Sequence, residues 1–328
     1  VLAKIVDLRL KKANLLGVEN YASLVLEESM AKNPENAHAL LEEIWHWALK
    51  KAKKERQDLQ TLIQASGEDF TLEAWDWWYY AEKLKSQRYD INEEDLKPYF
   101  SLNKVREGAF LLANKLWGIS FEPLHGVKTY HQEVEVFKVL DADQSFLGVL
   151  YTDYFPRKSK RAGAWMDEIQ TQYKKGGENI RPAVINVGNF SKPTENAPSL
   201  LTLDEVQTLF HEFGHALHAL FSQLTYPSLS GTNVSRDFVE LPSQLMENWA
   251  THPEMLKQYA VHYETLEPMP DSIMKKIQEM QAFNQGFNTV ELVAAAMLDL
   301  EWHSLLEENK KEVAEFEREF FENICLLP

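Results

Sequence analysis

The sequence predicts a mainly α-helical fold with a small antiparallel β-sheet, and two periodicities support this prediction. Apolar residues recur at helical spacing over about 1–31. A second helix, rich in Ala, Glu and Lys, is predicted at about 37–65, and a long helical region at about 271–308. Polar and apolar residues alternate over 133–139, which is the period of a strand, and a second apolar run follows at 146–151. These two runs predict a β-hairpin, and the apolar run 183–187 predicts a third strand.

Turn-forming residues divide the helical part into elements. Asn33-Pro34 and Ser66-Gly67 end the first two predicted helices, and Thr71 opens another. Residues 92–118 predict one or two more helices, interrupted near Pro98. The sequence pattern then changes from helical periodicity to a mixture of helical and strand periodicity, without a clear linker. We therefore predict two regions, a helical one at 1–120 and a mixed helical and strand region at 121–328.

Composition excludes some classes of protein. The chain has 328 residues, a formal net charge of −16 and a sequence pI near 5.1. An acidic surface disfavours binding to nucleic acid, and no apolar run approaches the roughly 18 residues that span a membrane. The single cysteine, Cys325, fits a reducing compartment such as the cytoplasm, with the periplasm as the alternative. The chain begins at Val1 rather than Met, and we interpret it as a fragment.

The motif His211-Glu212-Phe213-Gly214-His215 carries the chemistry. Thr202 and Glu205 form a capping-box pattern, which predicts a helix from about 202 to 224 around the motif. On a helix, His211 and His215 lie on one face and can bind the same ion, with Glu212 beside them as general base for a water held by that ion. The alternative is a non-catalytic helical binding protein in which His-Glu-x-x-His occurs by chance.

A catalytic zinc site needs a third protein ligand. Phe221 stands where an extended metzincin motif would have a histidine, so that version is excluded. Glu240, at the start of another predicted helix, is the leading candidate by spacing, and Glu247 is the second. His218 lies about 10 Å along the helix from His211, too far to share the ion.

Other side chains near these motifs are candidates for supporting roles. His218 is interpreted as a packing or cleft residue. Gln244 and Glu247 share a helical face with Glu240, and either could hydrogen-bond a metal-binding imidazole. The basic loop 157–163 has two interpretations, a solvated loop or a wall of a peptide-binding cleft.

These motifs resemble the thimet oligopeptidase family of zinc metallopeptidases. The resemblance rests on the segment from Thr208 to His218 and on the second motif from Asp237 to Gln244. The peptidyl-dipeptidase (dipeptidyl carboxypeptidase) branch is the most similar. Further matching stretches are Leu15-Leu16-Gly17, Pro98-Tyr99-Phe100, Tyr154-Phe155-Pro156-Arg157, Gly188-Asn189-Phe190-Ser191-Lys192-Pro193 and Tyr226-Pro227-Ser228-Leu229-Ser230-Gly231-Thr232.

The resemblance implies a zincin-like helical peptidase with two lobes and a deep cleft, in which 1–120 belongs to the N-terminal lobe and 121–328 to the zinc-binding catalytic region. It implies one Zn²⁺ per chain on His211, His215 and Glu240, with Glu212 as the base. It also implies that the strand ending at Asn189-Phe190 pairs with substrate backbone. The loop 226–235, with Gly231 and Thr232, would then face the substrate.

The implied activity is hydrolysis of short peptides with release of C-terminal dipeptides. An endo-acting oligopeptidase of the same family is the alternative. Members of the family continue into a Gly- and Tyr-rich segment that supplies an oxyanion donor and substrate contacts. This chain stops without that segment, so we expect the oxyanion donor and the anchor for the substrate's C-terminal carboxylate to lie beyond Pro328.

Overall fold

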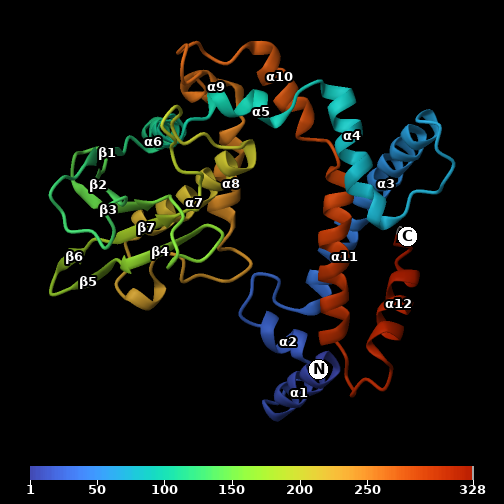
Figure 1. The fold of residues 1–328 in the computed structure, drawn as a ribbon. Helices are drawn as coiled ribbons and strands as arrows, with labels where there is room; N and C mark the ends of the chain where they lie inside the picture. Colours follow the sequence, from blue (N-terminus) through green and yellow to red (C-terminus); the bar gives the residue numbers. More distant parts are fainter. Residues whose placement is uncertain (327–328) are drawn as a thin grey trace. The chain divides into compact units, whose positions relative to one another are not determined.

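The computed structural model describes residues 1–326, which form two compact units. One unit consists of Val1–Asp90 and the residues from Glu279 onward, and the other of Ile91–Gln278. Figure 1 shows the first unit as helices alone and the second as helices around a sheet. None of the helices in the described part of the chain is long and apolar enough to cross a membrane.

In the first unit, one long helix packs lengthwise against another. Helix α3 begins at Pro34, where the Asn33 side chain accepts a hydrogen bond from the Asn36 N–H and caps the helix. Its small side chains Ala48 and Ala52 meet the apolar face of α11. The helices of this unit are α1 (Leu2–Leu15), α2 (Tyr21–Leu26), α3 (Pro34–Ala65), η1 (Ala74–Asp76), α4 (Trp77–Tyr89), α11 (Gln285–His303) and α12 (Val313–Asn323).

Two of the long predicted helices are interrupted. The stretch 1–31 is broken after Leu15, where Gly17 adopts a positive φ of 82° and turns the chain. The stretch 271–308 divides into α10 (Asp271–Met280) and α11, and Asn284 between them has a φ of 56°. A single continuous helix over 1–31 is therefore wrong, whereas the predicted helical region 271–308 is present as two helices.

The second unit contains a five-stranded sheet in the order β1-β2-β3-β7-β4. The predicted hairpin is present as β2 and β3, and the predicted third strand as β7. Strand β7 runs parallel to β3, while the other pairings are antiparallel, so the sheet is mixed rather than purely antiparallel. The strands are β1 (Ser120–Pro123), β2 (Glu135–Leu140), β3 (Phe146–Asp153), β4 (Trp165–Gln170) and β7 (Ala183–Val187), with β5 (Tyr173–Lys175) and β6 (Glu178–Ile180) as a separate pair.

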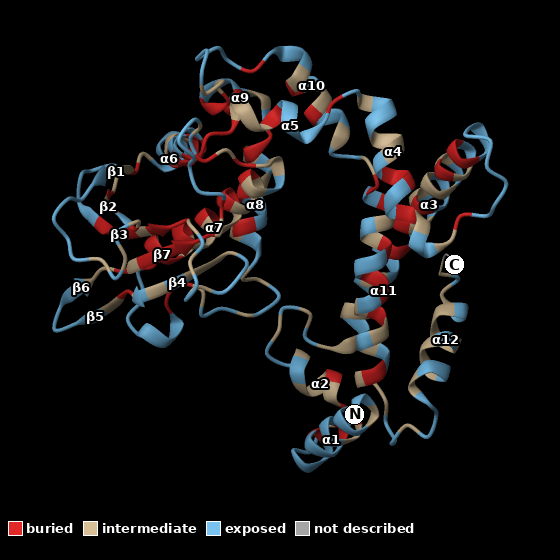
Figure 2. Cartoon of the chain, viewed as in Figure 1, coloured by how far each residue is buried: buried red, intermediate tan, exposed pale blue. Residues whose placement is uncertain are grey.

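Helix α7 (Leu203–Leu220) covers one face of this sheet. The predicted capping box is present: the Thr202 hydroxyl accepts from the Glu205 N–H, and the Glu205 carboxylate accepts from the Thr202 N–H. Gly148 of β3 has no side chain where the Leu220 side chain lies, so the end of the helix can approach the strand. Figure 2 shows the buried residues of this unit concentrated in α7 and the neighbouring strands.

Helix α8 (Leu241–Ala250) returns beside α7, and Pro242 occupies its first turn as the sequence predicts. The mainly helical fold with a small sheet is thus confirmed. The first strand begins at Ser120, beside the predicted change from a helical to a mixed sequence pattern. The remaining helices of this unit are α5 (Glu93–Leu96), η2 (Lys97–Tyr99), α6 (Leu102–Trp117), η3 (Pro227–Leu229) and α9 (Pro253–Tyr259).

Candidate metal centre

Two imidazoles and one carboxylate converge between α7 and the start of α8. Glu240 Oε2 lies 3.2 Å from His211 Nε2 and 3.0 Å from His215 Nε2. One donor atom from each of these three residues lies within 4.8 Å of the others. Two imidazole nitrogens and a carboxylate oxygen are a donor set that suits a divalent zinc ion with one coordination position left open.

The short distance between α7 and α8 depends on Gly214. A Cβ atom at this position would lie 2.6 Å from the Ser243 Cα and 2.8 Å from the Pro242 carbonyl oxygen. Real Cβ atoms do not approach other atoms so closely, so only glycine allows this contact. The spacing between the helices in turn brings Glu240 to the two histidines.

The fully buried Ser243 lies beside the Glu240 carboxylate. Its hydroxyl is 2.9 Å from Glu240 Oε2 and 2.8 Å from the Glu240 carbonyl oxygen, so it can donate to either. Helical serines often bond the backbone of the preceding turn, and that role explains the second contact. The first contact restricts the same carboxylate oxygen that faces the imidazoles.

Glu247 is one of the two residues predicted to hydrogen-bond an imidazole, and it lies beside the ring of His211. Its Oε1 lies 2.5 Å from Nδ1 of His211. A carboxylate only accepts hydrogen bonds, so the proton of a neutral His211 resides on Nδ1 and the Nε2 lone pair faces Glu240. Gln244 has an exposed side chain and does not take this role.

The carboxyl group of Glu212 lies next to the three donors in a partly buried position. Burial raises its pKa to about 7; Glu240 also raises it, whereas His211 and the Met166 N–H oppose the rise. A carboxylate with a pKa near neutrality is suited to accept and return a proton at physiological pH. Burial also lowers the pKa of His215, which favours the neutral ring that a metal requires.

Strand β4 lies alongside this carboxyl group. It packs against α7, and the contact between the Met166 N–H and Glu212 joins the two elements. Within the described sheet, β4 is an outer strand with β7 on one side only. Its other side is therefore the one that can pair with an added peptide strand.

The expectation that the strand ending at Asn189-Phe190 pairs with substrate is wrong. Strand β7 lies between β3 and β4, which occupy both of its hydrogen-bonding sides. Beyond the strand, the Phe190 N–H bonds to the Tyr154 carbonyl, and the buried Phe190 ring packs on Tyr154. The amide of Asn189 donates to the carbonyls of Arg161 and Gly163, so this residue anchors a loop.

The two residues predicted to face substrate from the following loop lie beside β4. Gly231 is buried, donates its N–H to the Ser222 hydroxyl, and has the Glu168 carboxylate where a side chain would be. The Thr232 N–H also bonds to Glu168. Gly231 therefore packs against the strand, and it also lines the pocket beside His218.

His218 is not part of the donor cluster. Its ring packs near Phe238 and lines a mostly apolar pocket of about 440 Å³ between α7, α8 and the loop after α7. Burial lowers its pKa. Leu217, Phe221, Leu229, Leu245 and Met246 also line this pocket.

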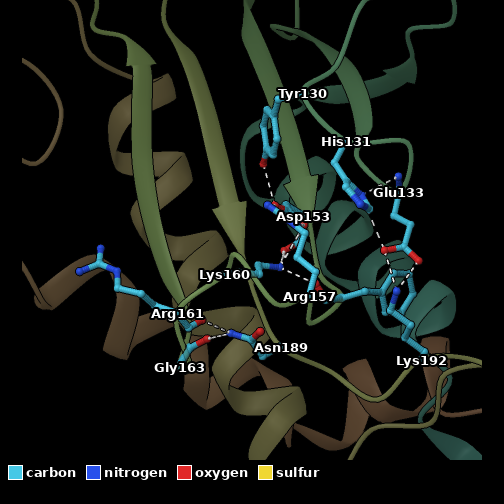
Figure 3. A network of polar contacts seen from close by, with 11 residues as sticks. Tyr130, His131, Glu133, Asp153, Arg157, Lys160, Arg161, Gly163, Asn189 and Lys192 are labelled. Atoms are coloured by element: carbon cyan, nitrogen blue, oxygen red, sulfur yellow. Dashed lines mark hydrogen bonds and ion pairs between the residues drawn. The ribbon is translucent and has the colours of Figure 1, made fainter.

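A polar network that the sequence did not predict fixes the loop between β3 and β4 (Figure 3). Asp153, at the end of β3, accepts hydrogen bonds from Arg157, Lys160 and Tyr130. The sequence shows a run of basic residues at 157–161. That run does not indicate that two of these cations, Arg157 and Lys160, turn inward to Asp153.

Comparison with known proteins agrees with the motifs. The sequence profile of Peptidase family M3 matches residues 1–325. The chain belongs to peptidase family M3. The resemblance found in the sequence is thereby confirmed.

Several curated M3 relatives cover nearly the whole chain. It is 41% identical over 322 residues to "Dipeptidyl carboxypeptidase" of Salmonella typhimurium and 42% identical over 320 residues to the protein of that name in Escherichia coli, with 97% of the chain covered in each case. "Oligopeptidase A" of Escherichia coli is 36% identical over 93% of the chain. The chain spans about half the length of these relatives, from 45% to 47%.

Proposed function

We propose that this chain carries the zinc-binding centre of a metallopeptidase that hydrolyses short peptides and releases C-terminal dipeptides. The observation that carries the proposal is the convergence of His211, His215 and Glu240 beside the partly buried Glu212. The two relatives with the highest identities quoted above are named dipeptidyl carboxypeptidase, which supports the dipeptide-releasing branch.

The proposed roles follow from the geometry. His211, His215 and Glu240 would hold one Zn²⁺, which supplies a Lewis acid that polarises a peptide carbonyl and acidifies water. Glu212 takes the proton of the attacking water and returns it to the leaving amine. Glu247 holds the His211 ring in place, and the outer side of β4 pairs with the backbone of the peptide.

Zinc content tests the centre itself. We expect about one zinc per chain after purification without chelators, and a large loss of zinc in Glu240→Ala. A Glu254→Ala variant, which changes a glutamate of α9 outside the cluster, serves as the matched control. A chain that binds no zinc would instead support a helical binding protein with a chance motif.

The products of hydrolysis test the activity. An N-blocked peptide of about six residues should lose its C-terminal dipeptide, and mass spectrometry of the products identifies the cleaved bond. Cleavage at internal bonds, irrespective of distance from the C-terminus, would instead favour an endo-acting oligopeptidase, the activity class suggested by the relatives named oligopeptidase A. Glu212→Gln should abolish either activity while the zinc content is kept.

We also propose a cytoplasmic location. Cys325 is exposed as a free thiol, which a reducing compartment preserves. One of the relatives is named "Probable cytosolic oligopeptidase A". Fractionation of cells that express the tagged native protein tests this location against the periplasm.

A further inference from the structure

The loop between β3 and β4 contains four cationic side chains, and two of them form ion pairs with the buried Asp153 carboxylate. Arg157 donates two hydrogen bonds of 2.8 Å to the Asp153 carboxylate. Lys160 donates to the same carboxylate at 3.0 Å, and both side chains of that pair are only 2% exposed. These contacts give the loop a fixed conformation. They also pair the charges of Arg157 and Lys160 with the Asp153 carboxylate.

The backbone of Arg161 is anchored by a hydrogen bond, whereas its side chain is exposed. Its carbonyl accepts a hydrogen bond of 2.8 Å from the Asn189 amide, which fixes where the side chain begins. Figure 3 shows this side chain extending away from Asn189 and from the Asp153 network. The residue is exposed, and within residues 1–326 its guanidinium has no carboxylate partner.

The Arg161 guanidinium is also oriented by an aromatic ring. It lies over the ring of Trp165, 5.5 Å from the centroid. Such a cation–π contact restricts a long side chain before any ligand binds, so less conformational entropy is lost on binding. Trp165 is the first residue of β4, so the contact places the cation at the N-terminal end of the outer strand.

Arg161 and the centre contact neighbouring residues of β4, Trp165 and Met166. The Met166 N–H faces Glu212, so a peptide bond that reacts there lies opposite the first residues of β4. A peptide that pairs antiparallel with β4 has its C-terminus toward the N-terminal end of the strand. Two residues beyond the reacting bond extend about 7 Å, which brings the terminal carboxylate to the side where Arg161 lies.

We propose that Arg161 binds the C-terminal carboxylate of the peptide substrate and so determines that two residues are released. The inference rests on the proposed function. A guanidinium binds a carboxylate through two parallel N–H···O bonds, and the position of Arg161 relative to Met166 sets the length of the released piece. The anchor that we expected beyond Pro328 thus has a candidate within the chain.

Lys158 provides a matched control. It belongs to the same loop, carries the same charge and is exposed, but it makes no contact with Trp165. If general attraction between a basic loop and an anionic peptide were responsible, Lys158→Gln and Arg161→Gln would have similar effects. If Arg161 binds the carboxylate directly, only Arg161→Gln has a large effect.

The test compares one N-blocked pentapeptide that ends in a free carboxylate with the same peptide ending in an amide. We expect Arg161→Gln to lower kcat/KM for the free acid by about 10- to 100-fold and to leave the amide unchanged within about twofold. Arg161→Lys should recover part of the loss, and Lys158→Gln should resemble the native chain. Equal effects of Arg161→Gln on acid and amide would overturn the proposal.

A binding measurement separates failure of the anchor from failure of the proposed function. In a Glu212→Gln background, calorimetry should give a Kd for the free acid about 10-fold or more below that for the amide, with the difference lost in Arg161→Gln. If no peptide is hydrolysed but this difference in Kd is present, the peptidase proposal fails and the anchor stands. If the free acid and amide bind equally, the anchor fails whether or not the chain hydrolyses peptides.

Discussion

Glu247 Oε1 lies 2.5 Å from Nδ1 of His211, on the side of the imidazole opposite the Nε2 that faces Glu240. The two glutamates lie seven residues apart, at the start and near the end of α8. One helix therefore provides both a proposed donor for the metal and a hydrogen-bond acceptor for the imidazole of His211. The contact with Glu247 fixes the orientation of the His211 ring.

Removing this acceptor should weaken metal binding. We expect Glu247→Ala to lower zinc affinity by about 10- to 100-fold, because the His211 ring can then rotate and exchange its Nδ1 proton for one on Nε2. Competition with a chromogenic chelator measures the affinity. Gln244→Ala, on the same helix with an exposed side chain, is the control and should leave the affinity unchanged. Equal affinities for Glu247→Ala and the native chain would contradict the assigned role.

Substitution of Gly214 should separate the two helices of the centre. Gly214→Ala places a methyl group 2.6 Å from the Ser243 Cα, so we expect a stability loss of about 1–3 kcal/mol together with weaker zinc binding. Denaturant unfolding and chelator competition measure the two effects.

Gly286→Ala is a suitable control for the Gly214 variant. Its added methyl group would lie 2.5 Å from the Ala52 backbone nitrogen, in the unit without the metal centre. It should lower stability by a similar amount and leave zinc affinity unchanged. If both variants affect zinc affinity equally, the spacing of α7 and α8 is not what positions Glu240.

The features that could be predicted from the sequence are those that depend on residues close together in the chain. His211 and His215 on one helical face follow from the helix period, and the capping box marks where that helix begins. Glu240 could be ranked first from its spacing and from Pro242, which indicates a first helical turn. No proline interrupts the predicted helical region 271–308, and the break within it falls at Asn284, which has a positive φ.

The features that depend on long-range pairing could not be predicted. The segment Trp165–Gln170 does not alternate cleanly between polar and apolar residues, so neither β4 nor its outer position was found. The sheet order then decided that β7 is enclosed. Likewise, Arg157 and Lys160 turn inward only because Asp153 lies at the end of β3, whereas the run of basic residues reads equally well as a solvated loop.

The raised pKa of Glu212 should make the metal-free chain less stable at alkaline pH. Burial raises the pKa to about 7 in the folded state from 4.5, so the folded state binds the proton more tightly than the unfolded state. This contribution is fully present below pH 4.5 and is lost as the pH rises through about 7. The difference in unfolding free energy between metal-free Glu212→Gln and the metal-free native chain should therefore shift in favour of the variant between pH 5 and pH 8. We expect a shift of about 1 kcal/mol after solvent screening.

Unfolding in urea with a chelator present measures this difference. Glu254→Gln, a change of charge on α9, controls for the general effect of removing a negative charge. The same pH dependence in native chain and Glu212→Gln would show that Glu212 is not the group that titrates near neutrality.

Asp153 should contribute stability that is lost in acid. Burial alone would raise its pKa, but hydrogen bonds from Arg157, Tyr130 and Lys160 outweigh burial and hold the pKa at about 2. The carboxylate therefore stabilises the fold above pH 3.8, by about 2 kcal/mol, and this contribution disappears as the pH falls through about 2. At pH 7, Asp153→Asn should cost about 3–5 kcal/mol, because the buried Lys160 ammonium loses its partner.

Two further variants identify the cause of that loss. Asp153→Asn combined with Lys160→Met should recover part of the stability, because no unpaired buried charge remains. Glu133→Gln, which breaks a more exposed ion pair with Lys192, should cost less than about 1 kcal/mol. Urea unfolding at pH 7 measures all three variants. A cost for Asp153→Asn no larger than that for Glu133→Gln would mean that the network does not stabilise the loop that carries Arg161.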